Sequence, residues 1–103
     1  MEVEEFREMV FSFPHVVENP HFDRQAFKAQ GKRIFTTLHQ KSGTVNLKLS
    51  PEEQATFCAF EGNVIYPVAN KWGQQGWTTF EIAEVPGELM LNALESAYNA
   101  SLR

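Results

Sequence analysis

The sequence contains little of what disulfide-stabilised, zinc-binding or membrane-spanning proteins require. Cys58 is the only cysteine among 103 residues, so no internal disulfide and no zinc site with several thiolates can form. We expect Cys58 to be a small buried thiol within a helix. No apolar run approaches the ~20 residues that cross a bilayer. The start, Met-Glu-Val-Glu-Glu, lacks the basic and apolar regions of a signal peptide, so we expect a cytoplasmic protein.

Motifs of catalysis are also absent. The chain has no nucleophile elbow, no phosphate-cradling glycine loop, no dinucleotide fingerprint and no His-Glu-x-x-His pattern. His15, His21 and His39 share no helical spacing, so we expect neither a metal site nor a cofactor. We therefore expect a protein that is not an enzyme, with a small enzyme using His21 and Glu18 as the catalytic alternative.

Hydrophobic periodicity predicts an α+β fold. The predicted helices cover residues 3–13, 51–60 and 86 onward, and the predicted strands cover residues 27–29, 34–39, 44–49, 64–68 and 77–82. Residues 15–25 show no clean period. Ser50, Pro51 and Glu53 form the capping box and first-turn proline of a helix start. The order α-βββ-α-β(β)-α predicts one domain over residues 1–103, an antiparallel sheet of four to five strands with helices mostly on one face.

The alternation also predicts which side chains point away from the core. In the run 34–39, Ile34 and Leu38 fall on the core face, and Phe35 falls on the opposite face with Arg33 and His39. Glycine-containing turns at 31–32 and 41–43 join the successive runs, which is typical of an antiparallel meander.

Charge is distributed unevenly along the chain. The formal net charge is −4, yet the 26 residues from Arg24 to Leu49 contain six bases and no acid. Cations and small polar groups on an exposed sheet face suit a phosphate backbone. The candidate nucleic-acid contacts are Arg24, Lys28, Lys32, Arg33, Lys41, Lys48 and Lys71. The alternative is a solvated face whose lysines prevent pairing between strand edges.

Residues 70–78 contain both tryptophans of the chain, Trp72 and Trp77, with Gly73 and Gly76 between them. The two rings could hold the loop against the sheet, or they could stack on a ligand. In the second interpretation His21, Trp72 and Trp77 surround one pocket with the segment 20–24, and they bind a protein or a small ligand.

Short fragments that follow one another along nearly the whole chain point to a known family. They are Phe13-Pro14, Pro20-His21-Phe22, Ala26-Phe27-Lys28, residues 31–35, residues 45–54, Pro67-Val68, Trp72-Gly73 and Gly76-Trp77-Thr78. In this order they resemble the MmcQ/YjbR-like family of small bacterial proteins. The resemblance implies an antiparallel α+β domain and DNA binding through a double-wing motif, whose wings would be the hairpins at Lys32 and Lys41.

The chain departs from that family at positions that bear on binding. Gln74 and Gln75 stand where relatives often carry arginine, and Asp23 stands where several carry glycine. Both departures make the surface less cationic. The sequence therefore predicts weak, salt-dependent DNA binding, with a protein- or small-ligand-binding module without a nucleic-acid role as the alternative.

Overall fold

Six strands form a single antiparallel sheet in the order β1-β2-β3-β4-β6-β5 in the computed structural model, which describes residues 1–103. The strands are β1 (Val16–His21), β2 (Arg24–Ala29), β3 (Ile34–His39), β4 (Thr44–Lys48), β5 (Ile65–Pro67) and β6 (Trp77–Glu81). The helices are α1 (Val3–Phe11), α2 (Pro51–Cys58), α3 (Lys71–Gln74), the 3-10 helix η1 (Ile82–Glu84) and α4 (Gly87–Ser101).

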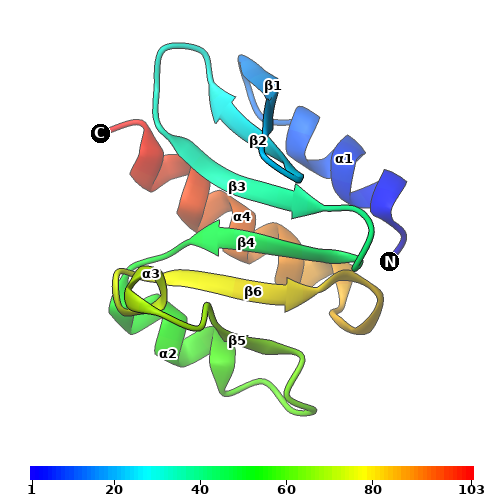
Figure 1. Ribbon diagram of the computed structural model, residues 1–103, viewed down its shortest axis with the longest axis vertical. Coiled ribbons are helices and arrows are strands. Elements are labelled where there is room, and N and C mark those ends of the chain that lie inside the picture. The colour runs from blue at the N-terminus through cyan, green and yellow to red at the C-terminus, as the bar shows by residue number, and fades with distance from the viewer.

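The helices leave one face of the sheet uncovered. Helix α4 crosses behind the sheet and packs on β2, β3 and β4, and α1 packs beside β1 (Figure 1). Helix α2 lies beside β5, and the short α3 sits at the end of the sheet where β6 begins (Figure 1). The predicted α+β class, with helices mostly on one face, is confirmed. No helix has the length and apolar content that a bilayer crossing demands.

Strand β1 is one strand more than the sequence predicted. It falls in residues 15–25, where Pro20 and the polar residues Glu18 and Asn19 hide any alternation. Because β1 is an edge strand that pairs only with β2, the missing N–H of Pro20 costs no ladder hydrogen bond. Two hydrogen bonds from Arg7 to Glu18, at 3.0 and 2.6 Å, tie α1 to this strand.

Local signals for the helices are confirmed. Ser50 Oγ accepts a hydrogen bond from Glu53 N at 3.1 Å, and Glu53 Oε1 accepts one from Ser50 N at 3.2 Å, so the capping box is complete. In α4, the apolar residues at helical spacing are buried, and Tyr98 is buried beside them; they are Met90, Ala93, Leu94 and Ala97. Cys58 ends α2 and is half-buried, so burial raises the pKa of its thiol.

A register shift between β2 and β3 overturns the predicted orientation of one aromatic residue. Phe27 pairs with Thr36 and Lys28 pairs with Ile34, so Phe35 is an extra, bulged residue. In such a bulge two successive side chains turn toward the same side of the sheet. Phe35 is fully buried, with its ring 5.4 Å from that of Tyr98, and Ile34 is only half-buried. The prediction that Phe35 faces outward and Ile34 faces the core is wrong.

Candidate functional site

The face of the sheet opposite α1 and α4, here called the open face, carries a row of small polar side chains. Thr37 pairs with both Ala26 and Asn46, and Asn46 pairs with Thr79. Cross-strand partners point to the same face, so Thr37, Asn46 and Thr79 follow one another across β3, β4 and β6, and the apolar Ala26 of β2 lies beside Thr37. This row is the floor of the candidate site.

A cavity of about 400 Å³, here called the face cavity, lies above this floor. Its lining residues are His21, Phe22, Asp23, Arg24, Thr37, Asn46, Val68, Trp72 and Trp77. One wall is the tip of the β1–β2 hairpin, and the other comprises Val68, α3 and the start of β6. The structure thus brings His21, Trp72 and Trp77 together, as the ligand-binding interpretation predicts, and adds Arg24 from the candidate phosphate contacts.

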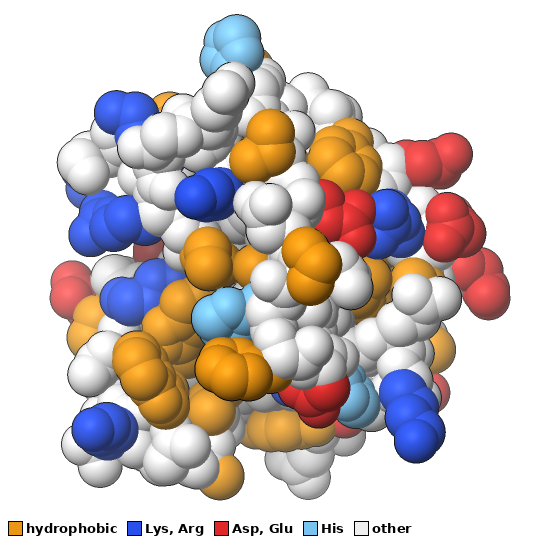
Figure 2. Space-filling view, turned by 45° about the horizontal axis from the view of Figure 1, so that its top comes forward, with side chains coloured by type: hydrophobic (Ala, Val, Ile, Leu, Met, Phe, Trp, Pro, Cys, Tyr) orange, Lys and Arg blue, Asp and Glu red, His pale blue; other side chains and the backbone are white.

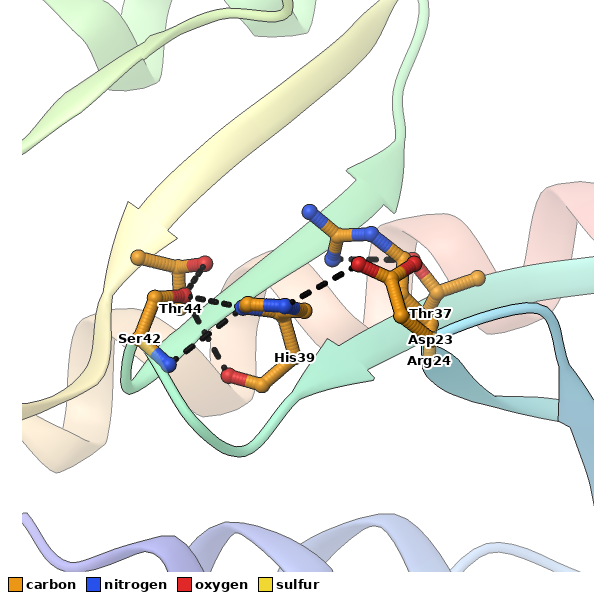
Figure 3. Close-up of polar contacts among 6 residues, drawn as sticks. All are labelled: Asp23, Arg24, Thr37, His39, Ser42 and Thr44. Atoms are coloured by element: carbon orange, nitrogen blue, oxygen red, sulfur yellow. Dashed lines mark hydrogen bonds and ion pairs between the residues drawn. The ribbon is translucent and has the colours of Figure 1, made fainter.

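Contacts with two residues of β3, His39 and Thr37, hold the hairpin tip in place (Figure 3). Asp23 Oδ2 lies 3.2 Å from His39 Nε2, and Arg24 donates to Thr37 Oγ1 at 3.5 Å. Ser42 N donates to His39 Nδ1 at 3.3 Å, so the neutral imidazole carries its proton on Nε2 and donates it to Asp23. This link between the tip and β3 therefore does not need a charged histidine.

Asp23, His39 and Ser42 are the residue types of a hydrolytic triad, but their contacts are those of a turn. Ser42 Oγ lies 2.6 Å from His39 Nδ1, 2.8 Å from Thr44 Oγ1 and 3.3 Å from His39 O (Figure 3). Ser42 is at the exposed β3–β4 turn and does not line the face cavity. The hydroxyl therefore stabilises the hairpin.

His21 and Glu18, the pair of the catalytic alternative, are not brought together. Glu18 is held by the guanidinium of Arg7 on the side of α1, and His21 lines the face cavity. An odd separation along β1 places the two side chains on opposite faces of the strand.

Five of the candidate cations gather at one end of the sheet, here called the basic end: Lys28, Lys32, Arg33, Lys48 and Lys71. Lys28 pairs with Ile34 at the start of β3, and Lys48 pairs with Trp77 at the start of β6. Lys48 Nζ donates to Gln75 O at 2.7 Å, which joins β4 to the turn after α3. Lys32 and Lys71 are exposed and form no side-chain hydrogen bond or ion pair.

Arg33 has a structural contact at this end. Its guanidinium donates to Ala100 O at 3.1 Å and to Arg103 O at 3.3 Å, at the C-terminal end of α4. Its positive charge complements the partial negative charge of that helix end. Arg33 also lines a second cavity of about 940 Å³ with Lys48, Trp72 and the acidic first turn of α2.

Lys41 lies away from the basic end. Successive hairpins of a meander fall at opposite ends of the strand that they share, and β3 has six residues, or about 20 Å. The β2–β3 and β3–β4 turns therefore lie at opposite ends of the sheet (Figure 1). Figure 2 shows most lysine and arginine side chains on the left of the viewed surface and most acidic ones on the right.

Tyr66 on β5 has a perturbed phenol. Its hydroxyl donates to the Glu81 carboxylate, and this hydrogen bond, with smaller contributions from burial and the negative charge, raises the pKa of Tyr66. The folded state binds this proton more tightly than the unfolded state, so its contribution to stability is present below the ordinary pKa and is lost as pH rises through the raised value.

We expect Glu81→Gln to lower the pKa of Tyr66. Absorbance titration of tyrosinate at alkaline pH, with Tyr66→Phe as the reference for the remaining tyrosine, measures this change. An unchanged titration in Glu81→Gln would show that the carboxylate does not perturb the phenol.

Thr37, Asn46 and Val68 line the face cavity but are not among the residues that the ligand-binding interpretation places around it. Phe22 belongs to the segment 20–24 of that interpretation, but the sequence predicts no hairpin there and so gives no position for its ring. Asn46 points to the open face with Thr37 and Thr79, and the course of the β1–β2 tip in space places the cavity above it. Asp23 is a signal that indicates this hairpin, because aspartate is common in turns and it lies between two short extended runs.

Comparisons with known proteins agree on the fold. A family model described as YjbR matches residues 11–100. The crystal structure of the Deinococcus radiodurans protein DR2400, a DUF419 domain, has a TM-score of 0.78 at 23% identity, covering 93% of this chain and 75% of that one. A Pseudomonas syringae protein has a TM-score of 0.74 at 16% identity, covering 98% and 99%. The comparison with curated proteins gives no match. At these identities the solved structures show a shared fold alone.

Proposed function

The chain belongs to the YjbR family, and we propose that this member is a non-enzymatic protein that binds DNA through the basic end of its sheet. The observation that carries the proposal is the gathering of five cations there in a protein with a net charge of −4. Positive charge concentrated on one surface attracts phosphates even when the whole chain is acidic.

The geometry favours one hairpin over two as the contact surface. Lys32 is at the tip of the β2–β3 hairpin, and Lys71 opens α3 beside Trp72. Both are exposed and unpaired, so they are available to phosphate oxygens. Lys28 and Lys48 are half-buried on the sheet between them. Lys41, at the far end of β3, is outside this surface.

We propose a protein that is not an enzyme because two potentially reactive side chains, Ser42 and Glu18, form structural contacts. The hydroxyl of Ser42 is engaged within its own turn, and Glu18 is engaged with Arg7. Neither lines the face cavity or the second cavity, where an activated nucleophile or base would meet a bound molecule.

Fluorescence anisotropy with labelled single-stranded and duplex DNA, titrated over a range of salt, tests the proposal. Five phosphate contacts predict that log affinity falls with log salt at a slope of about −3.5 for single strands and about −4.5 for duplex. Lys32→Glu should weaken binding and reduce the slope by about 0.7 to 0.9. Lys41→Glu makes the same charge change on another exposed hairpin turn. It should leave the affinity and the salt slope near their native values.

Two results would contradict the proposal. Binding that does not respond to salt would remove the phosphate contacts altogether. Equal weakening by Lys41→Glu and Lys32→Glu would show that the total charge of the chain matters and the basic end does not.

The second candidate function is a protein- or small-ligand-binding module with no nucleic-acid role. It is favoured by the assembly of His21, Trp72 and Trp77 around the face cavity and by the acidic net charge. Under this alternative, neither DNA form binds even at low salt.

A further inference from the structure

Two large aromatic side chains of the face cavity are exposed to solvent. Phe22 at the hairpin tip is 96% exposed, and Trp72 on α3 is 51% exposed. The neighbour of the Phe22 ring is His21, at 5.0 Å in an edge-to-face arrangement, and no aromatic contact joins Phe22 to the core. A single exposed hydrophobic residue needs no explanation. Two rings that line one cavity from different elements form a surface on which a flat molecule can stack.

The strand order places these rings on opposite sides of the floor. Phe22 joins β1 to β2, and Trp72 lies just before β6, while Thr37 and Asn46 belong to β3 and β4 in between. Phe22 also has a positive φ of 59°, a conformation that hairpin turns usually give to Gly, Asn or Asp. The tip nevertheless holds this shape through the Asp23–His39 contact.

The floor offers hydrogen-bond donors. Thr79 Oγ1 donates to Asn46 Oδ1 at 2.7 Å, and this contact orients the amide. No protein group accepts from Asn46 Nδ2, and no buried side-chain nitrogen is left without a partner, so this nitrogen is accessible to a ligand. Arg24 makes one long contact, at 3.5 Å to Thr37, so most of its guanidinium donors are free. Such a floor suits the carbonyl oxygens and ring nitrogens of a flat heterocycle.

The face cavity lies next to the basic end, with Trp72 and Trp77 between them. Trp72 and Trp77 line both the face cavity and the larger cavity, whose charged lining residues are Arg33, Lys48 and Arg103 together with Glu52 and Glu53 of α2. A ring stacked at Trp72 therefore lies next to cations that suit the phosphates attached to it. Aromatic stacking beside a positively charged groove is the general mode of single-strand binding.

We propose that the face cavity binds one unpaired nucleobase, stacked on Phe22 and Trp72, so that the protein prefers single-stranded to fully paired nucleic acid. This inference rests on the proposed function and names its substrate class. The bases of an intact duplex are stacked on one another, and a base must leave that stack before these side chains reach its flat surfaces.

The test compares a labelled oligothymidylate with the same strand annealed to oligoadenylate, by anisotropy at low salt. We expect the single strand to bind at least tenfold more tightly. Phe22→Gly and Trp72→Ala should each weaken single-strand binding about tenfold, because stacking on one aromatic side chain contributes that order of affinity. The slope of log affinity against log salt should not change, because the phosphate contacts remain.

The controls separate lost binding from lost folding. Glycine adopts a positive φ without strain, so Phe22→Gly should fold normally, as far-UV circular dichroism will show. Leu91→Ala removes an exposed apolar side chain from α4, on the covered side of the sheet, and should bind as the native protein does.

The outcomes distinguish the inference from the proposed function. Equal affinity for the two forms, with no effect of Phe22→Gly, would overturn the base-binding inference and leave salt-dependent binding by the basic end intact. Binding of neither form at low salt would overturn both.

Discussion

Replacing Gly76 by alanine should destabilise the protein by about 3 kcal/mol or more. An alanine Cβ at this position would lie 1.8 Å from Leu49 O, well inside van der Waals contact, and the backbone has a φ of +108°. The clashing atom belongs to the main chain, and a hydrogen bond from Leu49 N to Gly76 O at 3.1 Å holds the two segments together. The turn after α3 therefore has to move away from the end of β4, which carries Lys48.

The matched control is Gly31→Ala. Gly31 also has a positive φ, +80°, but an added Cβ would meet no atom within 4 Å. Only the conformational penalty applies, about 1 kcal/mol. Urea denaturation followed by circular dichroism measures both variants, and equal losses of stability would show that the close approach at Gly76 is not the cause.

Phe35→Ala should cost about 3–5 kcal/mol of folding free energy, because it removes a fully buried ring from the core. That ring packs edge-on against Tyr98 at 5.4 Å and against Phe13 at 6.5 Å, so neighbouring side chains cannot easily fill the space. Ile34→Ala, one residue away and half-buried, should cost about 1 kcal/mol.

This pair of variants tests the bulge in β3 directly. Strict alternation predicts that Ile34 is buried and that Phe35 is exposed, and therefore that the larger loss occurs at Ile34. Thermal or urea unfolding of the two variants decides between the registers. A larger loss for Ile34→Ala would contradict the register shift at Phe35.

Features that depend on near neighbours in the chain could be predicted from the sequence. The capping box of Ser50 and Glu53 needs only three residues of separation, and the apolar stripe of α4 needs only the helical period. The meander of β2, β3 and β4 likewise follows from alternation and glycine-containing turns. The family resemblance implied the same α+β fold, and the match to the family model over residues 11–100 confirms the resemblance.

The orientation of side chains on the sheet and the residues that share the face cavity depend on contacts between distant parts of the chain. The bulge at Phe35 depends on how β2 and β3 align and on the space that Tyr98 and Phe13 leave, and neither is a local property. Strand β1 forms because β2 offers it an edge, despite a sequence without alternation. Phe22 and Trp72, far apart in the chain, share a cavity because sheet pairing carries their two elements to opposite sides of one floor. Charge runs are visible in a sequence, but the separation of Lys32 from Lys41 follows from the direction of β3, since each turn of a meander reverses the chain at the opposite end of the strand.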